Sequence, residues 1–146
     1  MKTKVVVALM SSMITLVTLS GCGGSSNTQN KNTVLDNSKL ADGQNEFGYF
    51  GKNVIFGETK IVGKWTESGG EDTWHYTFQA DGKQIFNGGF FDGSILDYGV
   101  SSDGKTIKTD YFGSMNFVKK RSGDCYDIEE INSKGRIKNR TLCKYQ

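Results

Sequence analysis

The stretch Trp74-His75-Tyr76-Thr77-Phe78-Gln79 decides the fold. Large aromatic side chains alternate with polar ones, and this period of two is typical of a β-strand that buries one face. Trp74, Tyr76 and Phe78 are therefore predicted to point into the domain, where they are also the candidate ligand-facing residues. His75 lies between them, so its side chain is predicted to lie on the opposite, solvated face.

Similar β-prone stretches follow and precede this strand. Gly-centred pairs between them predict tight turns at residues 81–82, 103–104, 122–123 and 134–135. No segment has the period of an amphipathic helix, and consecutive short strands joined by hairpins are antiparallel. The other predicted strands cover residues 53–56, 60–67, 84–87, 94–100, 105–112, 114–120, 124–131 and 136–144. The sequence thus predicts an all-β fold, a small antiparallel meander. Closure into a short barrel would protect its edges, and an open meander is the alternative.

The turn at Asp103-Gly104 also predicts a strand register. With these two residues as the loop, one face pairs largely apolar residues: Val100 with Ile107, Tyr98 with Thr109, and Leu96 with Tyr111. A loop one residue longer would place polar residues opposite the apolar ones instead. Burial of one face favours the first register.

Two short motifs resemble those of a known family. Ile61-Val62-Gly63-Lys64-Trp65 is similar to the opening strand of lipocalins, and Thr109-Asp110-Tyr111 matches a second lipocalin motif. The resemblance implies a lipocalin-like barrel with Gly63 and Trp65 as structural residues at its base, and these two residues are not evidence of a ligand. The two motifs lie closer together than in full-length lipocalins, and no C-terminal helix follows.

The first residues have the features of an export signal. Lys2 and Lys4 precede an apolar stretch that ends at Leu19, and this stretch is too short and too rich in hydroxyl groups for a stable transmembrane helix. Leu19-Ser20-Gly21-Cys22 resembles the lipobox of bacterial lipoproteins. The resemblance implies that a signal peptidase recognises Leu19, Ser20 and Gly21, that cleavage leaves Cys22 first, and that acyl chains on its thiol anchor the protein in a membrane. An ordinary secretory signal is the alternative.

The remaining chain divides into a linker and one domain. Residues 22–46 are mostly small and polar, too poor in large apolar side chains to offset the entropy of ordering, and are expected to form a flexible linker after the lipidated cysteine. The expected organisation is a signal peptide at 1–21, this linker, and a β-barrel domain at 47–146. Gly23 follows the cysteine where an Asp often retains lipoproteins at the inner membrane, so the outer membrane is favoured.

The charge of the chain argues against nucleic-acid binding. The sequence has 18 Lys and Arg and 16 Asp and Glu, and the surplus of two equals Lys2 and Lys4 of the leader. The mature chain is therefore neutral, without the basic surplus of a typical nucleic-acid-binding domain. No cofactor-binding motif is present.

The three cysteines divide into one lipid acceptor and one pair. Asn132-Ser133-Lys134-Gly135-Arg136 suits a three-residue hairpin loop with Gly135 in the left-handed conformation. This loop pairs residue 132 with residue 136, and counting outward along both strands places Cys125 directly opposite Cys143. A disulfide between them is predicted, at a non-hydrogen-bonded pair with Cα atoms about 4.5 Å apart.

The sequence selects no catalytic residues and no metal ligands. His75 is the only histidine, and hydrolase, metalloprotease and EF-hand motifs are lacking. Four aspartates lie at or near predicted turns, where such residues favour local backbone hydrogen bonds: Asp92, Asp97, Asp103 and Asp110. We therefore expect a non-enzymatic protein.

Several surface features suggest binding. The aromatic, Gly-rich segments 47–51 and 88–93 either cap the core or contact a ligand or glycan. Arg136, Lys138 and Arg140 alternate on the last strand and share one face, expected to be solvated with Glu130 nearby. Ser122-Gly123-Asp124-Cys125-Tyr126 fits a motif of lipoprotein lysozyme inhibitors, and Ser133-Lys134-Gly135 is similar to their second motif.

Together these features predict a membrane-anchored envelope lipoprotein with a small binding domain. The first hypothesis is a small apolar ligand inside the barrel. The alternatives are a protein-binding module, such as an inhibitor of lysozyme or of a protease, and a purely structural surface protein.

Overall fold

The structure is a computed structural model that describes residues 35–69, 73–110 and 113–145. The predicted signal peptide, the lipobox with Cys22 and the first part of the predicted linker lie outside these residues. The same holds for Tyr111, the expected partner of Leu96. Among the described residues, no helix has the length and apolarity that a membrane crossing requires.

The described chain consists of short strands and two 3-10 helices. The helices are η1 (Asn37–Lys39) and η2 (Gly89–Phe91). The strands are β1 (Gly43–Asn45), β2 (Gly48–Phe50), β3 (Ile55–Phe56), β4 (Thr59–Lys60), β5 (Gly63–Ser68), β6 (Thr73–Phe78), β7 (Lys83–Phe86), β8 (Ile95–Val100), β9 (Thr106–Thr109), β10 (Gly113–Lys120), β11 (Cys125–Ile131) and β12 (Ile137–Tyr145).

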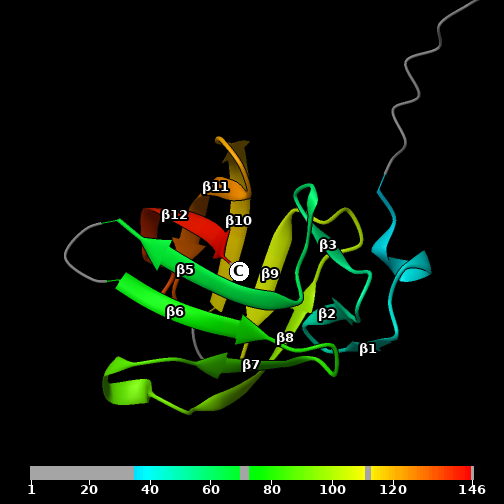
Figure 1. Cartoon of the computed structure of the whole chain (residues 1–146), viewed down its shortest axis with the longest axis horizontal. Helices are drawn as coiled ribbons and strands as arrows, with labels where there is room; N and C mark the ends of the chain where they lie inside the picture. The colour runs from blue at the N-terminus through cyan, green and yellow to red at the C-terminus, as the bar shows by residue number, and fades with distance from the viewer. Residues whose placement is uncertain (1–34, 70–72, 111–112, 146) are drawn as a thin grey trace, which may run out of the picture. The chain divides into compact units, whose positions relative to one another are not determined.

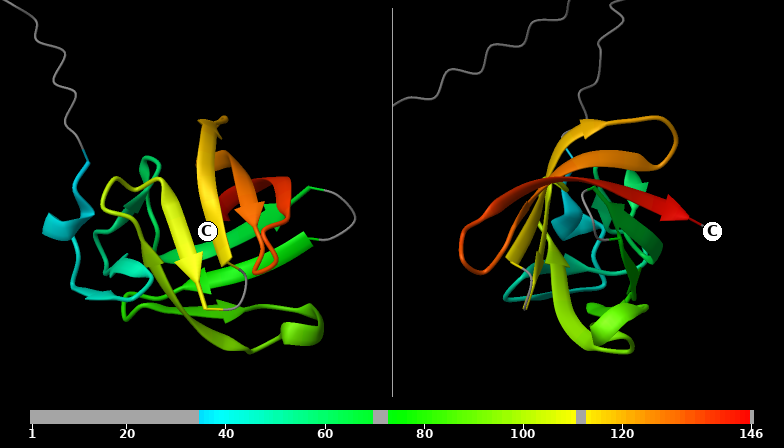
Figure 2. Two further views of the ribbon diagram at one scale, coloured as in Figure 1. Left: turned by 180° about the vertical axis from the view of Figure 1, so that it is seen from behind. Right: turned by 90° about the vertical axis from the view of Figure 1, so that its left-hand side faces the viewer.

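Eight of these strands form a closed antiparallel barrel. Their order is β8-β7-β6-β5-β12-β11-β10-β9, and β9 pairs again with β8. Figures 1 and 2 show the strands curving around a common interior. The predicted all-β fold and short lipocalin-like barrel are confirmed. Closure removes the free edges that a meander of this size would expose.

The register predicted for β8 and β9 is also confirmed. Tyr98 pairs with Thr109, and Val100 pairs with Ile107. The turn itself is longer than the predicted two residues, because the amide of Ser101 donates a hydrogen bond of 2.8 Å to the carbonyl of Thr106. A four-residue loop keeps the same pairing as a two-residue loop, so the inward face is unchanged.

The boundary expected between linker and domain is wrong. Residues from 37 onward already belong to the domain, because Asn37 in η1 is completely buried, with 0 % of its surface exposed. Its side-chain amide donates to the carbonyl oxygens of Ile55 (2.8 Å) and Ser101 (2.9 Å), and its carbonyl accepts from the amide of Ile55 (3.0 Å). β1 pairs with β2, and β2 extends the sheet at β8. The polar residues from 37 to 46 are ordered by hydrogen bonds to backbone groups elsewhere in the chain. The composition of the segment does not reveal these partners.

The small hairpin of β3 and β4 packs against the barrel core. The ring of Phe56 meets the rings of Trp65, Phe117 and Tyr126 edge-on, with centroids 5.8–6.5 Å apart. The hydroxyl of Thr59 donates to a carboxylate oxygen of Asp124 (2.7 Å) and lies 2.6 Å from the hydroxyl of Tyr126. The hairpin thus adds an aromatic side chain to the core.

Candidate functional site

Aromatic side chains occupy the interior beside β6. The alternation predicted for this strand is confirmed, since Tyr76 and Phe78 are buried, Trp74 is half-buried, and His75 is exposed. Tyr76 packs edge-on against Phe86 with ring centroids 5.0 Å apart, and the rings of Phe78 and Tyr98 are 4.8 Å apart. The residues expected to face a ligand therefore contact other side chains of the core.

Gly63 and Trp65 lie where β5 meets the end of β12. Trp65 is fully buried, and its indole nitrogen donates a hydrogen bond of 2.6 Å to the carbonyl of Ile61. The Nζ atom of Lys144 lies 5.8 Å from the centroid of the indole and donates to the carbonyl oxygen of Val62 (2.7 Å). Gly63 has φ +133°, and a Cβ there would lie 2.8 Å from the Cε atom of Lys144. A glycine is needed at 63 so that this lysine can lie over the tryptophan.

A buried polar cluster inside the barrel was not foreseen. Glu67 has 1 % of its surface exposed and accepts a hydrogen bond of 2.5 Å from the hydroxyl of Tyr76. The Nε atom of Arg140, also buried, lies 3.4 Å from Oε1 of Glu67 and 3.4 Å from Oε2 of Glu130. The consecutive strands β5, β12 and β11 thus bring two carboxyl groups to one guanidinium group.

Burial in this cluster favours the neutral form of the Glu67 carboxyl group. Burial raises the pKa of its carboxyl group to about 7, with a further increase from Glu130, against the lowering effects of the Tyr76 hydroxyl and Arg140. With Glu67 protonated, one carboxylate balances one guanidinium group, so the interior has no uncompensated charge. Burial also raises the pKa of Tyr76. The cluster has a titratable proton near neutral pH, but its side chains lie inside the barrel.

The basic face expected on the last strand is only partly solvated. Arg136 and Lys138 are exposed, as predicted, whereas Arg140 is buried, and the expectation is wrong for this residue. Lys138 and Arg140 do share one face of β12 with the buried Leu142, whereas Arg136 lies just before the strand. Glu130 is near, as expected, and its partner is the buried Arg140.

His75 and the aspartates have mostly local roles. The Nδ1 atom of His75 lies 3.1 Å from the hydroxyl oxygen of Thr66 on the outer surface. Asp103 accepts hydrogen bonds from the hydroxyl of Ser101 (2.6 Å) and the amide of Lys105 (3.1 Å), and the hydroxyl bond is the largest effect lowering its pKa. Asp97 forms an ion pair of 2.6 Å with Lys83. Among the described residues, no group of three or more His, Cys, Asp and Glu is arranged to hold a metal ion.

The two motifs that resemble lysozyme inhibitors do not meet. Ser122-Gly123 precedes β11 and Ser133-Lys134-Gly135 follows it, so the seven residues of this strand separate them. A strand of this length spans about 23 Å at roughly 3.3 Å per residue. Tyr126 of the first motif is buried in the core. The two turns therefore do not form one compact contact surface.

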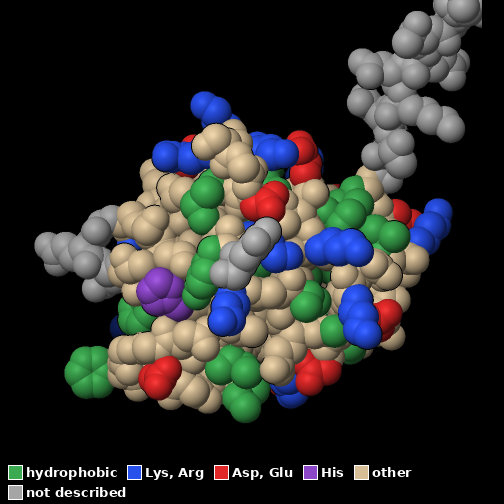
Figure 3. Space-filling model, viewed as in Figure 1, with side chains coloured by type: hydrophobic (Ala, Val, Ile, Leu, Met, Phe, Trp, Pro, Cys, Tyr) green, Lys and Arg blue, Asp and Glu red, His purple; other side chains and the backbone are tan. Residues whose placement is uncertain are grey.

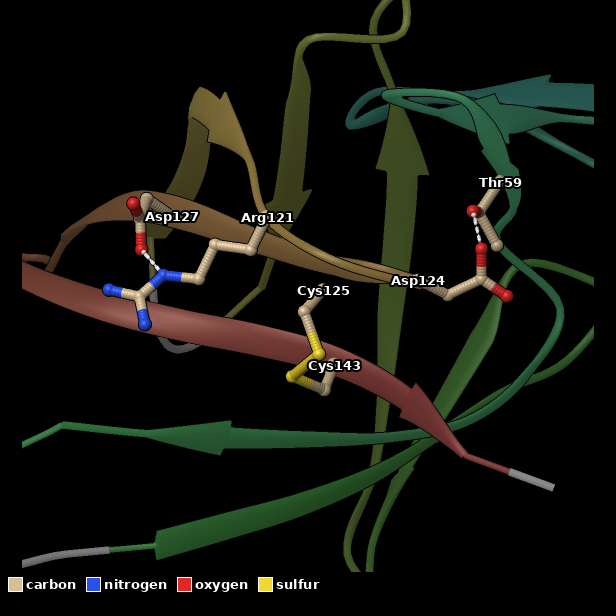
Figure 4. Close-up of a disulfide and its surroundings, with 6 residues drawn as sticks. All are labelled: Thr59, Arg121, Asp124, Cys125, Asp127 and Cys143. Carbon is tan, nitrogen blue, oxygen red and sulfur yellow. Dashed lines mark hydrogen bonds and ion pairs between the residues drawn. A yellow bond between two sulfur atoms is a disulfide. The ribbon is translucent and has the colours of Figure 1, made fainter.

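The predicted disulfide is present between Cys125 and Cys143 (Figure 4). The two residues are direct partners in the ladder of β11 and β12, and their Cα atoms are 4.0 Å apart. The turn has the expected geometry, because Gly135 has φ +72° and the amide of Asn132 donates to the carbonyl of Arg136 (3.1 Å). Asp127 on the same strand forms an ion pair of 2.5 Å with Arg121.

The two aromatic Gly-rich segments differ in exposure. In segment 47–51, Tyr49 and Phe50 pack against the core, as the capping interpretation predicts. In segment 88–93, Phe91 packs against the core, but Phe90 has an exposed fraction of 105 %, the largest among the exposed hydrophobic residues. Among the described residues, the β7–β8 connection therefore carries the most exposed aromatic side chain.

Comparison with known proteins gave no relative. No family model matches the chain, no curated protein matches it, and no solved structure matches it.

Proposed function

We propose that this protein is a non-enzymatic lipoprotein of the bacterial cell envelope that binds a macromolecular partner with the outside of its barrel. The sequence supports the anchor, through the lipobox-like stretch that ends at Cys22, and Gly23 favours the outer membrane. The observation that carries the binding role is the packing of the interior. Tyr76, Phe78 and Trp65 are buried against one another and their neighbours, which leaves recognition to the surface.

Two features argue against catalysis and nucleic-acid binding. The titratable Glu67 lies behind the barrel wall, where a substrate could reach it only if strands separated. The mature chain is neutral, so it has no general attraction for a polyanion.

Gln84 favours a second candidate function. This residue is fully buried on β7, and neither polar atom of its side-chain amide has a hydrogen-bond partner. An amphipathic small molecule that displaced part of the aromatic packing would find both a donor and an acceptor there. This candidate is a small, largely apolar ligand inside the barrel.

A fluorescence titration separates the two candidates. Both tryptophans line the barrel, Trp65 fully buried and Trp74 half-buried, so a ligand that entered would change their emission. We expect no saturable change when the purified domain is titrated with fatty acids up to micromolar concentrations. Saturable quenching, abolished by Gln84→Leu, would instead establish the small-ligand function. A lysozyme inhibition assay at the same concentrations tests the inhibitor hypothesis, and we expect no inhibition.

A further inference from the structure

Two adjacent phenylalanines in the β7–β8 connection differ in burial. The ring of Phe91 lies 6.2 Å from that of Trp74 and 6.0 Å from that of Phe86, and so joins the core. Phe90 is completely exposed. Figure 3 shows hydrophobic atoms standing clear of the surface at the end of the molecule where Figure 1 places this connection.

The loop that presents Phe90 is held by its own hydrogen bonds. A carboxylate oxygen of Asp92 accepts from the amide of Gly88 (2.6 Å), and the amide of Asp92 donates to the carbonyl of Gly89 (3.3 Å). The amide of Gly93 donates to the carbonyl of Phe86 (2.9 Å), which ties the loop to the end of β7. With Phe91 anchored in the core, the loop is preorganised, and preorganisation lowers the entropy lost when a partner binds.

The exposure of Phe90 favours insertion over stacking. An aromatic platform for a sugar ring packs one face against the protein and offers the other, whereas a side chain that is 105 % exposed has both faces free. Such a ring is fully covered only by entering a pocket. A phenylalanine buries roughly 150–250 Å² when it does so, and buried aromatic anchors of this kind dominate the energetics of protein interfaces.

The charge of the loop favours a protein over a membrane surface. Asp92, two residues after Phe90, is exposed, and its carboxylate disfavours contact with anionic lipid.

We propose that Phe90 inserts into an apolar pocket of a protein partner in the cell envelope and is the anchor residue of that interface. This inference rests on the proposed function, and it names both the contact residue and the class of partner.

Site-specific photocrosslinking in the cells that make the protein tests it. A photoreactive benzophenone amino acid is placed at position 90 of the full-length lipidated chain, and in a matched control at position 137. Ile137 is also an exposed apolar residue, 62 % exposed, but it lies on β12. We expect one discrete protein adduct from position 90 and none from 137, with the adduct suppressed by excess wild-type protein but not by excess Phe90→Ala. The purified adduct partner should bind Phe90→Ala at least tenfold more weakly than wild type, and Ile137→Ala as tightly as wild type.

The remaining outcomes overturn the inference in distinguishable ways. Adducts with lipid alone at position 90 would show that the loop enters a membrane. Protein adducts at position 137 but not at 90 would leave the proposed function standing and remove Phe90 from the interface. Absence of protein adducts at both positions, together with saturable fatty-acid binding, would remove the proposed function as well. Thermal unfolding of Phe90→Ala should match wild type, because the ring makes no contact in the folded domain, so a loss of binding is not a loss of folding.

Discussion

The hydroxyl of Tyr76 donates a hydrogen bond of 2.5 Å to a carboxylate oxygen of Glu67 inside the barrel. The acceptor comes from β5 and the donor from the neighbouring strand β6. Arg140 of β12 and Glu130 of β11 complete the cluster, and the exposed Lys138 adds a more distant positive charge. A titratable carboxyl group in a largely apolar core makes the stability of the folded state sensitive to pH.

Stability should decrease as the pH rises from about 4.5 to about 7. The pKa of Glu67 is about 7 in the folded protein and 4.5 without the fold, so the folded state binds the proton more tightly in this window. Protonated Glu67 therefore stabilises the folded state fully below its unfolded pKa. This stabilisation, up to about 3 kcal/mol, is lost as the pH rises through the folded pKa. Urea unfolding at a series of pH values measures it. Glu67→Gln should flatten the profile between pH 5 and 7, whereas Glu46→Gln, at an exposed carboxyl group, should leave it unchanged. An equal slope in Glu67→Gln would contradict the assignment.

Asn37→Ala should destabilise the domain by about 3 kcal/mol. The substitution leaves the amide and the carbonyl of the half-buried Ile55 without their partner, and it removes one of the two hydrogen bonds that the carbonyl of Ser101 accepts. Each buried polar group left unsatisfied costs roughly 1–3 kcal/mol. Chemical denaturation measures the loss. Ser38→Ala, at the exposed neighbour, is the control and should change stability by less than about 0.5 kcal/mol. If both variants behave alike, the segment before β1 does not contribute to the domain as described.

Replacing Cys125 and Cys143 together by serine should cost about 3 kcal/mol. The cysteines are separated by 18 positions, and a cross-link of this length removes roughly that much loop entropy from the unfolded chain. Reduced wild-type protein should unfold at the same denaturant concentration as the double variant. Alkylation of the folded, unreduced protein followed by mass spectrometry provides the independent check, and two modified thiols would refute the disulfide.

Cys22→Ser should abolish lipid attachment. Radioactive palmitate should label the wild-type protein, and the variant should be unlabelled and either released from membranes or left uncleaved. Cys125→Ser and Cys143→Ser are the matched controls, because they remove a thiol without touching the lipobox-like stretch, and both should retain the label. Persistent labelling of Cys22→Ser would refute the lipoprotein assignment.

Local patterns predicted the strands and their registers well. The β11–β12 register followed from one turn, because Gly135 fixes the length of the loop. Counting outward from that loop along both strands then gives every residue pair, including Cys125 with Cys143. The inward face of β6 followed from three aromatic residues at alternating positions. In both examples, the deciding interactions lie within a few residues or across a single hairpin.

The buried polar residues were not predicted, because their partners come from other strands. Glu67 follows Trp65 by two positions and thus shares its inward face, but a carboxylate is assigned to solvent unless its partners are known. A usable signal did exist for Arg140. The predicted register places it opposite Ile128, and it alternates with Leu142, so both neighbours point to the core. Asn37 offered no such signal, since backbone groups far along the chain hold it.

The pairing of β12 with β5 imposes an order on assembly. Cys143 of β12 lies opposite Thr66 of β5, so the ring cannot close until β12 is in place. Non-local pairings of this kind slow folding, and before closure the free edges of both strands remain available for wrong pairing. The hairpin of β11 and β12 needs no distant partner, and its cysteines are able to oxidise as soon as it forms. We expect the cross-linked hairpin to complete the ring, so removal of β12 should leave the barrel open between β5 and β11.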